Sequence, residues 1–252
     1  KDAKDNYPLK YILIIDEINR GNISDILGEL ITLLEKSKRR EGEESTIVTL
    51  PYSQKPFEIP DNIYIVGTMN TADRSISVLD TALRRRFDFV ELPPNYDDLS
   101  SLLKKKGVDK EKSLKGIDLI ELLKKINERI GFLLDKDHMI GHTYFMTVTN
   151  KESLVKVFAK NIIPLLEEYF HNDYENIQRV LGDNEIWGKK EENKIFQEKE
   201  EKTTKLFGGE VDGFDDVETF KLNKYFLNES EFSKVPSEVF TQIYEQVKSK
   251  SE

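Results

Sequence analysis

The stretch YILIIDEINRGN, residues 11–22, decides the fold class of this chain. A run of five large apolar residues is followed directly by two acids, Asp16 and Glu17. A short continuous apolar run is typical of a strand that is buried on both faces of a parallel sheet. Because ligands bind at the carboxyl ends of the strands in open α/β sheets, the acids are expected at a ligand-binding edge. The alternative is that they merely cap the helix that follows.

Strands and helices alternate from this stretch to Pro94. Apolar residues recur at helical spacing over residues 23–34, and Asn22 or Ser24 can cap the start of that helix. The charged stretch that follows, residues 35–45, is interpreted as a solvated connection. Further elements are expected in this order: a hairpin of 46–50 with 55–59, a buried strand over 63–69, a helix over 77–86 and a strand over 87–92. This order predicts an α/β sheet.

Helical periodicity dominates after Pro94, and it predicts a second, all-α domain. The helices are expected over residues 97–106, 117–135, 152–170 and 174–181. The charge-rich stretch 189–205 is expected to be a linker or an exposed helix, and residues 236–250 a final helix. The predicted domains are a partial α/β core, a helical domain and a charged C-terminal extension, over 1–95, 96–182 and 183–252.

The composition excludes several classes of function. The chain has 252 residues, no cysteine and a formal net charge of −9. The lack of cysteine excludes disulfides and thiolate metal sites. The negative charge argues against a chain that binds polyanions over its whole surface. No apolar run approaches the length of a membrane span and no signal peptide is recognisable, so a cytoplasmic protein without a membrane partner is expected.

Two neighbouring strands are predicted to end in polar clusters, DEINR and NTADR. Apolar residues followed by Asp-Glu form the Walker B pattern. In that interpretation Asp16 holds Mg²⁺, a cation that prefers oxygen ligands and keeps several waters. Glu17 polarises the water that attacks a γ-phosphate, and Asn70 orients that water or contacts the phosphate.

Three successive arginines, Arg84, Arg85 and Arg86, stand at the end of a predicted helix. Successive helical residues point about 100° apart, so the three side chains cannot all face one site. One of them is expected to reach the nucleotide of a neighbouring subunit, where an arginine stabilises the charge of the transition state. The alternative is a solvated cation cluster favoured by the helix dipole.

These motifs together resemble a known family. The strings IIDEINRGNISDILGELITLLE (14–35), GTMNTADRSISVLDTALRRRFDFVEL (67–92), IGHTYF (140–145) and IIPLLEEYF (162–170) resemble the AAA+ module of McrB-type GTPase subunits from modification-dependent restriction systems. The resemblance covers roughly residues 7–182. It implies a partial AAA+ nucleotide-binding sheet, from Walker B onward, followed by a helical lid.

The resemblance also assigns site residues. Asp16 and Glu17 become the Walker B pair, and Asn70 becomes the sensor 1 residue. A signature loop beside the nucleotide is completed by Thr71, Asp73 and Arg74. Arg85 matches the arginine finger, with Arg86 beside it as the alternative. His142, within the lid motif, is expected to have a packing role, and the isolated His138 and His171 imply no metal site.

The function implied by the resemblance is that of a restriction motor. Such a subunit hydrolyses GTP with Mg²⁺, forms a homo-oligomeric, hexameric ring and recruits a McrC-like nuclease subunit. GTP turnover then drives translocation along DNA, which the complete complex contacts. ATP remains an alternative substrate. Two other hypotheses about the function stay open. They are an AAA+ ATPase that remodels proteins and a non-catalytic interaction module.

One motif of a nucleotide motor is missing. A P-loop of the form GxxxxGK[ST], whose backbone N–H groups cradle phosphates, does not occur in these residues. In the family it lies upstream of Walker B, so we expect it before Lys1 in a longer parent protein. We therefore expect this chain alone to bind nucleotide weakly or not at all, and to be inactive.

Overall fold

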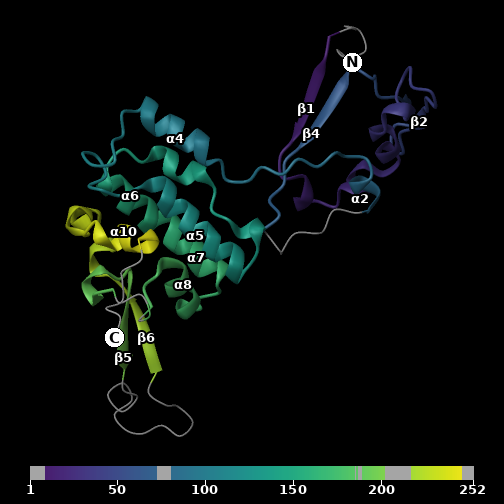
Figure 1. Cartoon of the computed structure of the whole chain (residues 1–252). Coiled ribbons are helices and arrows are strands. Elements are labelled where there is room, and N and C mark those ends of the chain that lie inside the picture. Colours follow the sequence, from purple (N-terminus) through teal and green to yellow (C-terminus); the bar gives the residue numbers. More distant parts are fainter. Residues whose placement is uncertain (1–8, 73–80, 185, 187–188, 202–216, 246–252) are drawn as a thin grey trace, which may run out of the picture. The chain divides into compact units, whose positions relative to one another are not determined.

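Figure 1 shows the computed structural model of the chain. It describes residues 9–72, 81–184, 186, 189–201 and 217–245. The chain divides into two compact units, residues 1–91 and residues 92–252. The first unit is α/β and the second is mainly helical, which confirms the predicted fold class. The predicted three-part division at residues 95 and 182 stays a prediction.

The first unit is built on two parallel strands, β1 (Tyr11–Ile15) and β4 (Ile63–Gly67), which lie side by side (Figure 1). Both strands were predicted from their apolar runs. The prediction that both strands are buried is wrong for the described structure. Ile12 and Ile14 of β1 are 67% and 68% exposed, and Tyr64 and Val66 of β4 are 40% and 49% exposed. A parallel strand is buried only when further strands and helices cover it, and the described residues place only two strands in this sheet.

The helix expected over residues 23–34 is shorter than predicted. α2 (Ile23–Leu27) begins after Asn22, whose side chain accepts from the backbone N–H of Asp25, as the capping prediction expected. Gly28 then takes a φ of +49°, and residues 28–34 continue as a 3₁₀ helix. Because a positive φ breaks the α-helical hydrogen-bond pattern, apolar spacing alone could not show this interruption.

The charged stretch 35–45 is not simply a solvated connection, because Arg39 is buried. Its guanidinium donates to the carbonyl oxygens of Leu33 and Leu34 at 3.2 and 2.9 Å, and to Ile63 O at 2.5 Å. It thus satisfies the free carbonyls at the end of the 3₁₀ helix and joins them to β4. The predicted hairpin is confirmed in a short form, with β2 (Val48–Thr49) antiparallel to β3 (Pro56–Phe57).

The last element of the first unit is α3 (Thr81–Arg84). The strand expected over residues 87–92 is wrong, because these residues form no strand and pair with no described segment. Their large side chains Phe89, Val90 and Leu92 are exposed. A strand requires a neighbouring strand to complete its hydrogen bonds, and the local apolar pattern carries no information about such a partner.

The second unit contains the predicted helices. They are α4 (Tyr96–Lys105), α5 (Leu119–Leu133), α6 (Lys151–Val157), α7 (Ile163–Tyr169) and α8 (Tyr174–Leu181). Four of them begin at a side chain that accepts from the first turn, namely Asn95, Asp118, Asn150 and Asp173. A π-helical turn at residues 158–162 links α6 to α7 just before Pro164, which has no N–H to continue the α-helical pattern.

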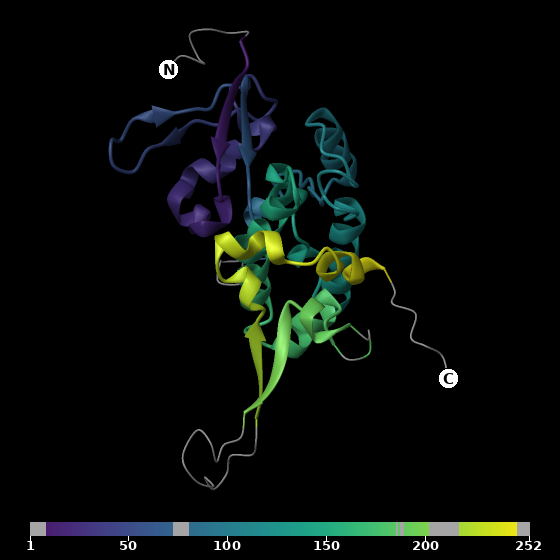
Figure 2. The same cartoon turned by 90° about the vertical axis from the view of Figure 1, so that its left-hand side faces the viewer.

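The C-terminal part of the chain belongs to the core of this second unit. β5 (Phe196–Glu201) pairs antiparallel with β6 (Val217–Leu222), and α10 (Glu238–Tyr244) follows. The prediction of a linker or exposed helix over 189–205 is therefore wrong for its described part. Figure 2 shows the two strands extending from the helices. Phe226, Phe232 and Phe240 are buried in the same hydrophobic cluster as α5 and α8.

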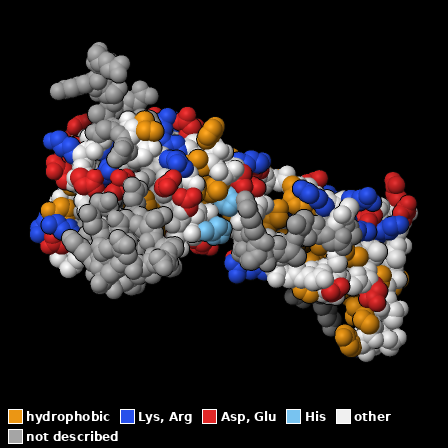
Figure 3. All heavy atoms as spheres, turned by 90° about the horizontal axis from the view of Figure 1, so that it is seen from below, with side chains coloured by type: hydrophobic (Ala, Val, Ile, Leu, Met, Phe, Trp, Pro, Cys, Tyr) orange, Lys and Arg blue, Asp and Glu red, His pale blue; other side chains and the backbone are white. Residues whose placement is uncertain are grey.

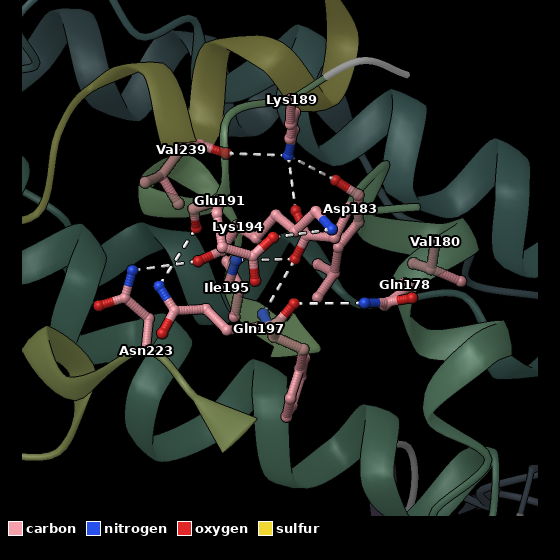
Figure 4. A network of polar contacts seen from close by, with 12 residues as sticks. Gln178, Val180, Asp183, Lys189, Glu191, Lys194, Ile195, Gln197, Asn223 and Val239 are labelled. Carbon is pink, nitrogen blue, oxygen red and sulfur yellow. Dashed lines mark hydrogen bonds and ion pairs between the residues drawn. The ribbon is translucent and has the colours of Figure 1, made fainter. Parts of the chain in front are cut away.

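A buried polar network fastens this C-terminal part to the helices (Figure 4). Lys189 Nζ donates to Asp183 Oδ1 at 2.8 Å and to Leu181 O at 3.0 Å. The other oxygen of Asp183 accepts from the backbone N–H groups of Ile195 and Phe196, at 2.7 and 3.1 Å. The pair thus joins the end of α8 to the start of β5. Burial raises the pKa of Asp183 and lowers that of Lys189, and their mutual contact opposes both shifts.

Candidate active site at the ends of β1 and β4

The parallel register places two polar segments next to each other. Ile15, the last residue of β1, lies opposite Gly67, the last residue of β4. Beyond this pair, the backbone of Thr68 donates to Ile15 O at 3.0 Å and accepts from the N–H of Ile18 at 2.8 Å. The acids after β1 and the polar residues after β4 therefore leave the sheet from the same edge, as the sequence predicted.

Asp16 and Glu17 are both exposed at this edge. The Thr68 hydroxyl donates to Asp16 Oδ1 and accepts from the backbone N–H of Glu17 at 3.1 Å. Sequence reasoning missed Thr68 as a site residue. A hydroxyl residue directly after a strand, opposite two acids, was the signal that could have found it.

Glu17 has an uncommon backbone conformation. Its φ and ψ are both 51°, in the left-handed region that non-glycine residues seldom adopt. Its carboxylate forms an ion pair with Arg20, and both side chains are largely exposed. The backbone turns sharply here, so that Glu17 leaves the line of the strand while Ile18 returns to the core.

Asn70 is held in the loop after β4 from two sides. Asn19, which is only 7% exposed, donates from Nδ2 to the carbonyl oxygen of Asn70 at 3.1 Å. The side-chain oxygen of Asn70 accepts from the N–H of Ala72 at 3.1 Å. Because that oxygen is engaged, the side-chain Nδ2 is the group of Asn70 suited to contact a ligand. Thr71 is exposed beside it.

The three arginines after α3 have different surroundings. Arg84 lies over the ring of Phe89, 5.9 Å from its centroid. Arg86 pairs with Glu35, with 2.8 Å between Nη2 and Oε1. The side chain of Arg85 is exposed and has no partner among the described residues. The other two predicted loop residues, Asp73 and Arg74, lie outside the described residues.

His138 and His142 have structural partners in the second unit. His142 Nδ1 accepts from the N–H of Asn95, the N-cap of α4, at 3.0 Å. His138 lies 2.6 Å from Asp135 and meets the ring of Tyr169 edge to face. Within the described ranges, no three His, Asp or Glu side chains are grouped as a metal site.

Basic and acidic side chains are not segregated on the one face of the molecule that Figure 3 draws. On the face in Figure 3, basic and acidic side chains are interspersed over the described residues. In the part of the chain that the structure describes, no helix is both long enough and apolar enough to cross a bilayer.

Each of the two units contains a segment that matches the model of a known protein family. The model of the AAA domain, dynein-related subfamily, matches residues 3–87, and the model of the McrB alpha-helical lid domain matches residues 118–178. The two parallel strands, with acids at the carboxyl end of β1, and the helical unit thus define a AAA+ protein.

Two relatives narrow this class. The chain is 38% identical over 199 residues to the type IV methyl-directed restriction enzyme EcoKMcrB subunit of Escherichia coli, covering 73% of this chain and 42% of the relative. It is 30% identical over 193 residues to the type II restriction enzyme BsuMI component YdiS of Bacillus subtilis, covering 68% of this chain and 52% of the relative. The chain belongs to the McrB-type AAA+ subunits, and it spans about half the length of these relatives.

Proposed function

We propose that this chain is the motor portion of a GTP-hydrolysing AAA+ subunit in a McrBC-like, modification-dependent restriction endonuclease. The observation that carries the proposal is the register of β1 and β4, which brings Asp16 and Glu17 to the same sheet edge as Asn70. This is the arrangement that hydrolysis of a nucleoside triphosphate requires, because phosphoryl transfer depends on positioning and charge neutralisation.

The residues at this edge fit a magnesium nucleotide. Asp16 is exposed and uses one carboxylate oxygen for Thr68, so Oδ2 has no partner among the described residues. A carboxylate oxygen open to solvent suits Mg²⁺, which is bound through one or two carboxylates and keeps several waters. Bound Mg²⁺ would neutralise charge on the phosphates. Asp16 would hold the cation, Glu17 would polarise the attacking water and Asn70 would orient it.

Arg85 is proposed as the arginine finger. Since Arg84 is over Phe89 and Arg86 is paired with Glu35, Arg85 is the member of the three best suited to reach another molecule. A finger supplied to a neighbour requires an assembly, and we propose a homo-oligomeric ring, hexameric as the resemblance implies. Thr71, Asp73 and Arg74 are proposed to complete the nucleotide-binding loop.

The choice of GTP over ATP, translocation along DNA and a McrC-like nuclease partner are carried over from the McrB type. The names of both relatives, which describe parts of restriction enzymes, support a role within a multi-subunit restriction system. The lack of a P-loop motif within residues 1–252 supports the proposal that these residues alone are inactive.

The test is hydrolysis of GTP and of ATP by the complete parent protein, with and without the product of the neighbouring gene. GTP turnover that the neighbour stimulates is the expected result. ATP turnover that is indifferent to the neighbour would instead indicate a protein-remodelling ATPase, and no turnover of either nucleotide would indicate an interaction module. Glu17→Gln is the matched variant, expected to retain nucleotide binding and ring assembly while losing turnover.

A further inference from the structure

Thr68 contacts every residue of the turn that follows β1. Its backbone N–H donates to Ile15 O at 3.0 Å, and its carbonyl oxygen accepts from Ile18 N at 2.8 Å. Its hydroxyl donates to the carboxylate of Asp16 and accepts from the N–H of Glu17 at 3.1 Å. One residue thus binds four consecutive residues of a distant segment, and it is 51 positions from Glu17 and 52 from Asp16.

The hydroxyl is matched to these two partners. A threonine hydroxyl has one donor and two acceptor sites, so it can serve an acceptor and a donor at the same time. Asp16 and the Glu17 amide supply one of each. A left-handed conformation at a non-glycine residue is unfavourable and persists only where the surroundings enforce it. The bond to the Glu17 amide is one of the contacts that enforce it.

We propose that Thr68 is a positioning residue for the hydrolytic reaction, which fixes Asp16 and Glu17 in the relative orientation that the reaction needs. This inference rests on the proposed function of the two acids. The bond to Asp16 Oδ1 restrains the carboxylate and leaves Oδ2 without a partner among the described residues. The bond to the Glu17 amide holds the turn that carries the second carboxylate out of the strand.

The experiment compares Thr68→Val, which keeps the side-chain shape and removes the hydroxyl, with Thr68→Ser, which keeps the hydroxyl. Both are made in the complete parent protein together with Glu17→Gln. Thr49→Val is the matched control, because Thr49 is an exposed residue of β2 in the same unit. The measurements are kcat and KM for nucleotide, the Mg²⁺ concentration for half-maximal turnover, the melting temperature and ring assembly.

Thr68→Val is expected to lower kcat, raise the Mg²⁺ requirement, or both, by about 10–100-fold, the usual effect of losing a partner that orients a metal ligand. KM for nucleotide and ring assembly should change little. Thr68→Ser should restore most of the activity, and Thr49→Val should behave as the wild type. A general loss of stability would not produce this separation of kcat from KM or this rescue by serine.

Two results would overturn the inference in distinguishable ways. If Thr68→Val turns over normally while Glu17→Gln is inactive, the proposed function stands and the role of Thr68 is wrong. If Glu17→Gln is as active as the wild type, or the wild type hydrolyses neither nucleotide, the proposed function is wrong. The inference about Thr68 is then wrong as well.

A second measurement does not depend on whether Thr68→Val folds. In the wild-type protein the amide of Glu17 should exchange slowly with solvent, although its side chain is exposed, because its N–H donates to the Thr68 hydroxyl. Thr68→Ser should keep this protection. Exchange of the wild-type amide at the rate of an unstructured peptide would rule out the contact and the proposal with it.

Discussion

Asp183 and Lys189 form an ion pair at 2.8 Å in which both side chains are 0% exposed. Lys189 also donates to the carbonyl oxygen of Leu181, and it lies 3.5 Å from that of Val239 in α10 (Figure 4). This ion pair thus contacts the end of α8, the start of β5 and the C-terminal helix α10.

Removing one member of this pair should destabilise the protein strongly. Asp183→Asn leaves the Lys189 ammonium buried without its counter-charge, which typically costs about 3–5 kcal/mol of unfolding free energy. Urea unfolding followed by circular dichroism measures the change. Glu192→Gln is the matched control, because Glu192 pairs with Lys190 at an exposed position and should change stability by less than about 0.5 kcal/mol. Equal effects of the two variants would contradict the prediction.

Arg85 and Arg86 should separate into a catalytic and a structural residue. Arg85→Ala in the complete protein is expected to lower kcat by several orders of magnitude without lowering the melting temperature, because its side chain is exposed. Mixing it with subunits that carry an intact finger but the Glu17→Gln change should restore part of the activity. Arg86→Ala should mainly lower stability, since it breaks the contact with Glu35. Normal turnover by Arg85→Ala would show that another residue is the arginine finger.

The C-terminal helix should be required for the stability of the second unit. Phe240 is fully buried and meets Phe158 edge to face, with 4.9 Å between ring centroids. Phe240→Ala is therefore expected to cost about 3–5 kcal/mol of unfolding free energy. Phe132→Ala, at an 88% exposed position of α5, is the control and should be nearly neutral. If both substitutions prove neutral in urea unfolding, α10 is not part of this core.

The carboxylate of Asp135 should contribute to stability only above acidic pH. The contact with His138 and the backbone N–H groups of Asp137 and His138 lower its pKa in the folded protein. A group with a depressed folded pKa stabilises the fold above its unfolded pKa, about 3.9, and loses this contribution as pH falls through the folded value.

The corresponding test is the difference in melting temperature between the wild type and Asp135→Asn as a function of pH. The wild type should be more stable at neutral pH, and the difference should shrink as the pH falls below about 4. Asp137→Asn removes an exposed carboxylate from the same turn and is the control. A difference that stays constant down to pH 2 would show that the charge of Asp135 has no part in it.

Several features followed from local sequence patterns. The apolar runs gave both parallel strands, and helical spacing gave α4, α5 and α8 to within a few residues. The capping residue Asn22 could also be predicted from the sequence, because a cap bonds to an amide only three positions away. Family resemblance added the prediction of a nucleotide site, since strings such as GTMNTADRS combine many residues at a fixed spacing.

Local patterns gave wrong predictions where a distant partner decides the structure. The apolar run 87–92 looked like a strand but pairs with no described segment. The charged run after Lys189 looked solvated, although Phe196, the first residue of β5, is buried in the core of the second unit. Charge content describes one face of a strand, and whether the other face finds a core depends on residues far along the chain.

By itself the sequence determined the class of the fold, the McrB-type family and the two acids at the end of β1, because these depend on short-range spacing and on residue type. Only the tertiary structure decided which neighbours act on those residues. Thr68 reaches Asp16 and Glu17 across about fifty positions, and Glu35 engages Arg86 rather than Arg85 across a similar span. Such contacts arise when separate segments pack together, and no periodicity in either segment encodes its partner.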